Sequence, residues 1–232
     1  MDYSYIDKNY EEINAKIERA LEASPCGERP VFLAAIKSAE ADEVNYLCKK
    51  FGIRDVGENR VQQLLARYDA LDKENLNIHF IGSLQTNKVK YIVDKVCMIH
   101  SLDRIELARE IDKQAKKIGK IMDVLVEINI GEEENKGGVD PQKAEAFCRE
   151  LSDFKNIKLR GFMTMAPKCD KKEDYLKYFC ETYQLVLDIW QKKLHNIDRP
   201  IISMGMSDSF EEAIMCGSTM VRIGRSLFNK NQ

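Results

Sequence analysis

One lysine and two glycine-containing loops are the residues of this sequence best suited to chemistry. Lys37 comes directly after the apolar run 31–36. A charged ammonium at the end of a buried strand is costly, and partial desolvation favours the neutral, nucleophilic amine that Schiff-base formation requires. The alternative is a lysine whose aliphatic stem is buried while its charge reaches solvent. Position alone leaves both interpretations open.

The two loops lie near the C-terminus, at Ser203-Met204-Gly205-Met206-Ser207 and Val221-Arg222-Ile223-Gly224-Arg225-Ser226. Gly205, Ser207 and Gly224 are suited to binding a phosphate, because glycine lets backbone amides approach the oxygens and serine adds a hydroxyl. Asp208 is an ordinary residue at a helix N-terminus. A reactive lysine together with a phosphate-binding pair of loops indicates a phosphorylated carbonyl compound, for which pyridoxal 5′-phosphate (PLP) is the obvious candidate.

Arg222 adds a prediction about how PLP would behave. It lies at the end of the last apolar run, close to the second loop. If it faces the pyridine nitrogen, its permanent charge keeps that nitrogen unprotonated, whereas an acidic partner would strengthen the ring as an electron sink. The alternatives for Arg222 are a phosphate ligand and an ion pair at the rim.

The elements that must position these residues alternate between short apolar runs and longer amphipathic ones. The apolar runs predict buried parallel strands at 31–36, 53–56, 78–81, 96–99, 122–130, 159–165, 201–204 and 220–223. We expect seven helical connections and a helix before the first strand, at 9–23. Eight such units in 232 residues predict an α/β fold, a single (β/α)8 TIM barrel over 1–232 with residues 1–28 forming a helix that packs on it. An open doubly wound sheet is the competing architecture.

Composition excludes several classes of protein. The chain has 36 Lys+Arg against 38 Asp+Glu, so no global charge attracts nucleic acid or anionic membranes. No apolar stretch approaches the ~20 residues of a transmembrane helix, and the N-terminus lacks a secretory signal, so we expect a cytoplasmic protein. The seven cysteines form no C-x-x-C pair and predict reduced thiols rather than disulfides or a zinc site. The three histidines have no metal-ligand spacing.

Several segments together resemble the pyridoxal phosphate homeostasis family, which is similar to the N-terminal barrel domain of alanine racemase. They occur in family order between residues 31 and 228: Ala34-Ala35-Ile36-Lys37, Val56-Gly57-Glu58-Asn59, the segment from His79 to Lys88, Ile99-His100-Ser101, Gly161-Phe162-Met163-Thr164, Ser203-Met204-Gly205-Met206-Ser207 and the segment from Gly217 to Gly224. The Ser-Met-Gly-Met-Ser and Val-Arg-Ile-Gly segments are the most specific.

The resemblance implies a cofactor, PLP, and residues that would bind it. Lys37 would form the Schiff base, Asn59 would lie near the ring, and Arg222 near the pyridine nitrogen. Ser207, Gly224 and Arg225 match the family's phosphate contacts, and Met204 is expected as a further cofactor-binding residue. Because Arg225 stands where the family often has a small hydroxyl residue, its backbone N–H is the preferred contact. Lys136 matches a family lysine implied in exchange or in a second PLP site, and the alternative is a solvated loop cation.

These expectations favour a PLP carrier over an enzyme. Alanine racemase carries a further β-rich domain with a catalytic tyrosine, whereas the predicted barrel uses all 232 residues. We therefore expect reversible Schiff-base formation without significant turnover, with release or transfer to apo PLP-dependent enzymes, and the resemblance implies a monomer. Two alternatives stay open: a small amino-acid racemase that obtains an acid from a partner subunit, and a barrel that binds another phosphorylated metabolite.

Overall fold

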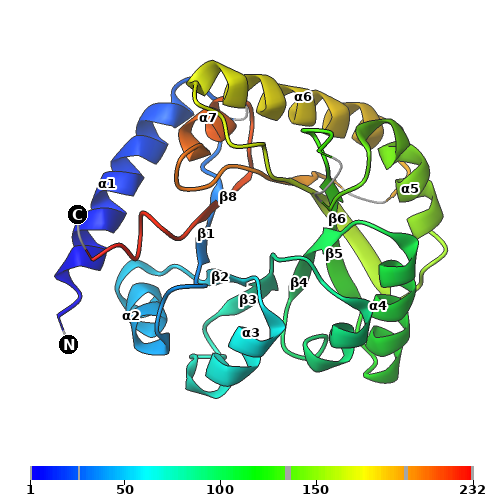
Figure 1. Ribbon diagram of the computed structural model, residues 1–232, viewed down its shortest axis with the longest axis horizontal. Coiled ribbons are helices and arrows are strands. Elements are labelled where there is room, and N and C mark those ends of the chain that lie inside the picture. The colour runs from blue at the N-terminus through cyan, green and yellow to red at the C-terminus, as the bar shows by residue number, and fades with distance from the viewer. Residues whose placement is uncertain (1, 26, 134–136, 196–197, 231–232) are drawn as a thin grey trace.

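The computed structural model describes residues 2–25, 27–133, 137–195 and 198–230. Within these ranges, eight parallel strands close into a barrel in sequence order, and the first strand pairs with the last (Figure 1). The strands are β1 (Val31–Ala35), β2 (Asp55–Glu58), β3 (Asn77–Phe80), β4 (Met98–Leu102), β5 (Met122–Ile128), β6 (Ile157–Thr164), β7 (Ile201–Ser203) and β8 (Met220–Ile223). The predicted TIM barrel is confirmed, and the open sheet is excluded.

Helices surround the barrel and connect its strands. The α-helices are α1 (Ser4–Leu21), α2 (Ala41–Phe51), α3 (Val61–Arg67), α4 (Ile105–Lys117), α5 (Ala144–Leu151), α6 (Lys172–Gln191) and α7 (Phe210–Met215). The 3-10 helices are η1 (Tyr68–Ala70), η2 (Thr86–Tyr91) and η3 (Pro141–Lys143). The connection from β3 to β4 is therefore η2 rather than a longer α-helix. Its buried side chain is Val89, and such limited apolar contact does not support a long amphipathic helix.

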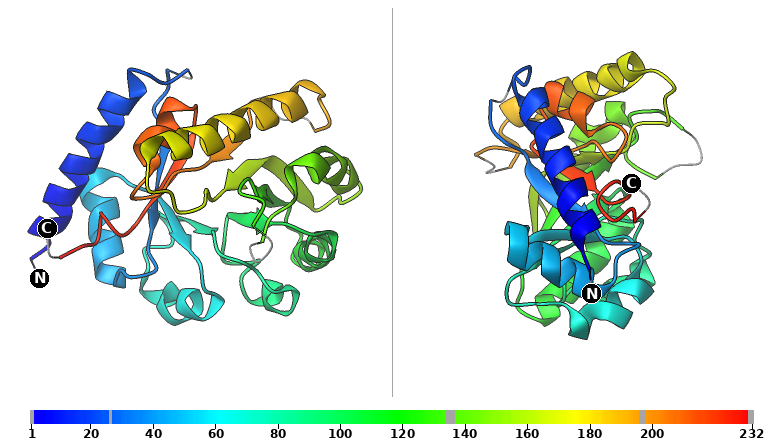
Figure 2. Two further views of the ribbon diagram at one scale, coloured as in Figure 1. Left: turned by 45° about the horizontal axis from the view of Figure 1, so that its top comes forward. Right: turned by 90° about the vertical axis from the view of Figure 1, so that its left-hand side faces the viewer.

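The first helix packs outside the barrel. Its apolar side chains at Ile6, Ile13 and Ile17 follow the helical repeat and are buried in the main core. Asn9 donates from Nδ2 to the carbonyl oxygens of Leu227 at 3.0 Å and Asn229 at 2.9 Å, which attaches α1 to the end of the chain. Helix α1 and the segment 227–229 consequently lie side by side at one edge of the molecule (Figure 2).

The barrel interior contains both apolar and polar side chains. Met98, Leu125 and Met163 form a small apolar cluster separate from the main core between strands and helices. The buried polar side chains include His79, His100, Ser203 and Arg222, which contact one another in a chain. Buried polar groups are stable only when they are hydrogen-bonded, so this interior is a network rather than a conventional apolar filling.

The prediction of reduced cysteines is wrong for one pair. Cys180 on α6 and Cys216 just after α7 form a disulfide with their Cα atoms 5.0 Å apart. They are 36 residues apart in the sequence, and only the packing of α6 beside α7 brings them together. Cysteine number and spacing do not reveal such a contact.

None of the helices in the described ranges combines the length and the apolar character that crossing a membrane requires.

Candidate functional site

A cavity of about 410 Å³ opens at the carboxyl ends of β1, β6, β7 and β8. Its lining includes five of the residues predicted to bind PLP: Lys37, Ser207, Arg222, Gly224 and Arg225. The other lining residues are Ala35, Met165, Ala166, Lys168, Tyr175, Met206, Asp208 and Ser209. This end of a barrel is where the connecting loops build active and binding sites.

Lys37 lies differently from the sequence-based expectation. β1 ends at Ala35, so Lys37 follows in a turn two residues later, and its side chain is exposed at the cavity rather than desolvated at a strand end. The strand itself is fixed by pairing on both sides, with Ala35 opposite Gly57 and Ala34 opposite Ile223. The position of the amine therefore depends on the turn and not on the strand alone.

Glycines allow the loops after β7 and β8 to approach their neighbours. Gly205 has a φ of +90°, and a Cβ there would lie 2.5 Å from the Cβ of Ala213. A Cβ on Gly224 would lie 2.4 Å from the carbonyl oxygen of Ala35. Larger residues would push the two loops away from β1 and α7, so both glycines are required by the close packing of this rim.

The hydroxyl groups of this rim fit a bound anion. Ser207 Oγ accepts a hydrogen bond from the backbone N–H of Ser226 at 3.2 Å, which joins the two loops. Ser226 Oγ is buried and has no hydrogen-bond partner within the described residues. A buried hydroxyl without a partner is costly, and a phosphate oxygen would supply the missing acceptor. Ser207 lines the cavity and suits the phosphate group of PLP, whereas Ser226, next to the cavity-lining Arg225, is not itself among the lining residues.

Asp208 and Arg225 form an ion pair at the mouth of the cavity. The expected capping role of Asp208 is wrong, because α7 begins at Phe210 after Ser209. The carboxylate instead compensates the charge of Arg225, whose side chain is exposed. Arg225 thus reaches the cavity as half of an ion pair and not as a free cation.

Arg222 is held rigidly inside the barrel mouth. It is 4% exposed, and its Nη1 donates to the carbonyl oxygen of Ser203 at 2.7 Å and to Ser203 Oγ at 2.8 Å. Its Nη2 donates to the carbonyl oxygen of Thr164 at 2.9 Å. These three bonds use only part of the five N–H donors of a guanidinium. Donor capacity therefore remains for a ligand in the cavity that Arg222 lines.

The carboxyl group of Glu127 and the guanidinium of Arg222 shift each other's pKa in this buried region. Burial lowers the pKa of Arg222 to about 10, and the nearby Glu127 opposes that effect. Burial raises the pKa of Glu127 to about 7, with a further increase from Asp103 and a decrease from Arg222. Arg222 therefore stays charged at neutral pH, whereas Glu127 titrates there. No motif in the sequence marks Glu127 as a buried carboxyl group beside Arg222.

A chain of hydrogen bonds connects Arg222 to the opposite end of the barrel. Asp55 Oδ1 lies 3.0 Å from His79 Nε2, His79 Nδ1 lies 2.9 Å from His100 Nε2, and His100 Nδ1 lies 3.5 Å from Ser203 Oγ. Burial opposes the charge on His79, but hydrogen bonds to Asp55 and Cys97 raise its pKa to about 9. Burial and the charges of His79 and Arg222 lower the pKa of His100 well below its usual value, so this imidazole is neutral.

Four residues named from the sequence do not line the cavity. Gly205 lies against Ala213 and Phe210 instead. Met204 is fully buried in the main core. Asn59 is half-buried, and its side-chain oxygen is buried without a hydrogen-bond partner among the described residues. Lys136 lies outside the described residues. Conversely, Lys168 in the loop after β6 and Tyr175 in the first turn of α6 line the cavity, although no glycine or repeated motif marks either position in the sequence.

The comparisons with known proteins agree on one family. The family model described as "Alanine racemase, N-terminal domain" matches residues 2–232. A protein of Aquifex aeolicus named pyridoxal phosphate homeostasis protein is 42% identical over 217 residues, covering 94% of each chain. A protein of the same name from Helicobacter pylori is 34% identical over 219 residues, covering 93% of this chain and 94% of its own.

A solved structure extends this similarity to the fold. The structure of PipY from Synechococcus elongatus PCC7942, described as having PLP bound, superposes with a TM-score of 0.81 and is 25% identical. The match covers 97% of this chain and 100% of PipY. The family model, the sequence identity and the barrel fold agree, and the chain therefore belongs to the alanine racemase N-terminal domain family, among its pyridoxal phosphate homeostasis proteins.

Proposed function

We propose that this protein binds PLP reversibly in the cavity at the barrel mouth and takes part in PLP homeostasis. The observation that carries the proposal is one cavity lined by Lys37, by the buried Arg222 and by the loops after β7 and β8, which contribute Ser207 and Gly224. The relatives named for PLP homeostasis and the PLP bound to PipY support the choice of ligand.

Each group has a distinct role in holding the cofactor. Lys37 supplies the amine, which condenses with the aldehyde carbon of PLP; a C=N bond replaces the C=O bond, and one water leaves. Ser207, Ser226 and the backbone at Gly224 and Arg225 bind the phosphate. Arg222 donates toward the pyridine nitrogen. When bound, PLP supplies an electron-withdrawing ring conjugated to the carbon attached to the amine.

Arg222 also supports a carrier without significant turnover. A guanidinium that stays charged donates a hydrogen bond to the pyridine nitrogen but does not protonate it, so the ring withdraws electrons less strongly than with an acidic partner. Three bonds to the backbone and side chain of β6 and β7 residues keep this guanidinium in place. The relatives' name, homeostasis protein, agrees with a binding role.

A spectrum of the protein with added PLP tests the proposal. We expect an absorbance band at about 420 nm that persists after desalting. Borohydride trapping followed by peptide mapping should place the modification on Lys37. Lys37→Ala should lose the band. Lys168→Ala is the matched control, since Lys168 is an exposed lysine of the same cavity, and it should keep the band. A wild-type protein that gives no band would overturn the proposal.

A racemase-like enzyme is the second candidate, because Tyr175 and Lys168 line the cavity beside Lys37 and offer further proton-transfer groups. Incubation of the PLP-loaded protein with L-alanine in D₂O separates the two functions. We expect no exchange of the Cα hydrogen at enzyme-like rates, in agreement with a carrier. Rapid exchange that disappears in Tyr175→Phe would establish the enzyme instead.

The proposal extends to how the protein operates in the cell. We place it in the cytoplasm as a monomer that hands PLP to apo-enzymes made in that compartment. Light scattering after gel filtration measures the monomer. Mixing the PLP-loaded protein with an apo-aminotransferase should activate that enzyme faster than the rate at which PLP dissociates into buffer. If activation were no faster than dissociation of PLP, the protein would buffer free PLP and would not transfer it directly to the apo-enzyme.

A further inference from the structure

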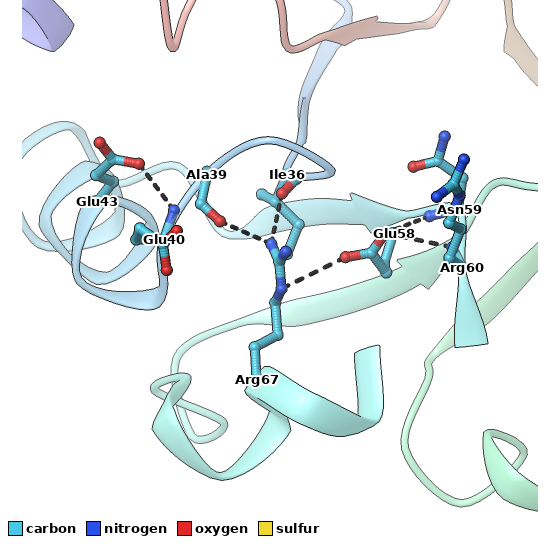
Figure 3. Close-up of polar contacts among 8 residues, drawn as sticks. All are labelled: Ile36, Ala39, Glu40, Glu43, Glu58, Asn59, Arg60 and Arg67. Atoms are coloured by element: carbon cyan, nitrogen blue, oxygen red, sulfur yellow. Dashed lines mark hydrogen bonds and ion pairs between the residues drawn. The ribbon is translucent and has the colours of Figure 1, made fainter. Parts of the chain in front are cut away.

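An arginine from outside the cavity holds the turn that carries Lys37. Arg67, at the end of α3, donates from Nη1 to the carbonyl oxygen of Ile36 and, at 2.9 Å, to that of Ala39 (Figure 3). These two carbonyls lie one residue before and two residues after Lys37 in the chain. A single guanidinium nitrogen therefore bridges both sides of the lysine.

Glu58 holds the same guanidinium from the opposite side. Its Oε2 lies 3.6 Å from Arg67 Nε, and its side chain is fully buried. Its other oxygen, Oε1, accepts the backbone N–H of Asn59 at 2.8 Å and that of Arg60 at 3.3 Å (Figure 3). Glu58 thus fixes both the arginine and the start of the loop after β2.

The two side chains depend on each other. Glu58 Oε2 has no hydrogen-bond partner among the described residues, so the charge of this buried oxygen is compensated by Arg67. Removing one partner of such a buried pair leaves an uncompensated charge, which is strongly unfavourable. The planar guanidinium can pair with the carboxylate and donate to the two carbonyls at the same time, whereas an ammonium is a point charge without that fixed geometry.

Neither side chain lines the cavity, yet both lie behind the turn that does. We propose that Arg67, supported by Glu58, is a positioning residue for Lys37: it fixes residues 36–39 so that the exposed amine faces the phosphate-binding loops. The inference rests on the proposed PLP function. Because Lys37 lies beyond the end of β1, strand pairing does not set its direction, and the Arg67 bonds replace that constraint.

Arg67→Gln tests this role, with two measurements. Without PLP, amide hydrogen exchange of the peptide covering residues 36–39 should become faster. With PLP, the band near about 420 nm should form about tenfold more slowly, since misplacing a reacting group reduces the productive fraction. Arg67→Lys should recover part of the rate, because it retains the cation but not the planar fork.

Lys120→Gln is the matched control. Lys120 Nζ also donates to two backbone carbonyls, those of Val93 at 3.0 Å and Val96 at 2.6 Å, in a loop that precedes β4. This variant loses a similar pair of bonds, but exchange at residues 36–39 and the rate of PLP capture should stay at the wild-type values. A general loss of stability would change both variants equally and would overturn the positioning role.

The outcomes distinguish this inference from the proposed function. If wild-type protein gives no band, the PLP function fails, while faster exchange in Arg67→Gln still supports the contact with the turn. If wild-type protein gives the band and Arg67→Gln captures PLP at the same rate with unchanged exchange, the positioning role is wrong. Should Arg67→Gln not fold, Glu58→Gln decides by the same two measurements, since its amide oxygen can still accept from Asn59 and Arg60.

Discussion

At the scale of single residues, the site contains polar groups whose hydrogen-bonding capacity the described polypeptide does not fully use. Ser226 Oγ is buried without a partner in the described chain, and Arg222 has N–H groups beyond the three used for Ser203 and Thr164. Ser207 connects the two loops through its bond to the Ser226 N–H. An anionic ligand at this point would satisfy the donors that the fold leaves in place.

Ser207→Ala should therefore weaken the binding of PLP but not of pyridoxal, which has the same ring and aldehyde without a phosphate. Hydrogen bonds to a charged group contribute more than neutral ones, so we expect about a tenfold increase in the Kd of PLP. Spectroscopic titration with both ligands measures the ratio. Ser83→Ala, at an exposed serine after β3, is the control and should leave both affinities unchanged. Equal weakening for both ligands would contradict a phosphate contact at Ser207.

At the scale of elements, the helices at the back of the site are joined covalently. The Cys180–Cys216 disulfide connects α6 to the end of α7, and α7 follows directly from the loop that carries Gly205 and Ser207. A disulfide stabilises a fold mainly by restricting the unfolded chain, and closing a loop of this length is expected to contribute a few kcal/mol.

Reduction of this disulfide, or Cys180→Ser, should lower the free energy of unfolding by about 2–4 kcal/mol. Urea unfolding with and without reductant measures the difference, and the reduced wild-type protein should behave like Cys180→Ser. Cys169→Ser, at one of the free cysteines, should leave the reductant-dependent difference intact. A Cys180→Ser variant as stable as the oxidised protein would show that the bond contributes nothing.

At the scale of the whole molecule, we propose that residues 1–232 act as one domain, because the apolar face of α1 packs into the main core outside the barrel and Asn9 of α1 binds the end of the chain. The barrel interior then makes that domain sensitive to pH. Burial opposes a charge on His79, but its bonds to Asp55 and Cys97 raise its pKa to about 9, above the ordinary value of 6.5.

A raised pKa means that the folded protein holds this proton more tightly than the unfolded chain. The stabilisation is complete below about pH 6.5 and is lost as the pH rises through about 9. We expect a single unfolding transition whose free energy falls by about 1–3 kcal/mol across this interval. Asp55→Asn should flatten that decline, whereas Asp69→Asn, which removes an exposed carboxylate paired with Lys73, should preserve it. If the free energy of unfolding of Asp55→Asn fell with pH as steeply as that of the wild type, the pH dependence would come from a group other than His79.

The agreement between sequence and structure is best where local pattern and packing coincide. Apolar runs such as the one at β1 predict the strands because both faces of a parallel sheet are buried. The agreement is weaker at element ends: β1 stops at Ala35 rather than before Lys37, and η2 replaces a longer helix. Ends are set by tertiary contacts, such as the Arg67 bonds to Ile36 and Ala39, which have no local sequence pattern.

The sequence by itself determined the alternation of strands and helices, the family resemblance and the residue types near the ends of β1, β7 and β8, because hydrophobic periodicity and short motifs are local properties. Closure of the sheet into a barrel, through the pairing of β1 with β8, was decided by the tertiary structure. Only the tertiary structure decided that Asp208 neutralises Arg225, that Cys180 meets Cys216 and that Glu58 and Arg67 support the turn of Lys37. These pairs join side chains from different elements. Their geometry exists only once the barrel has closed and has fixed the distances between those elements.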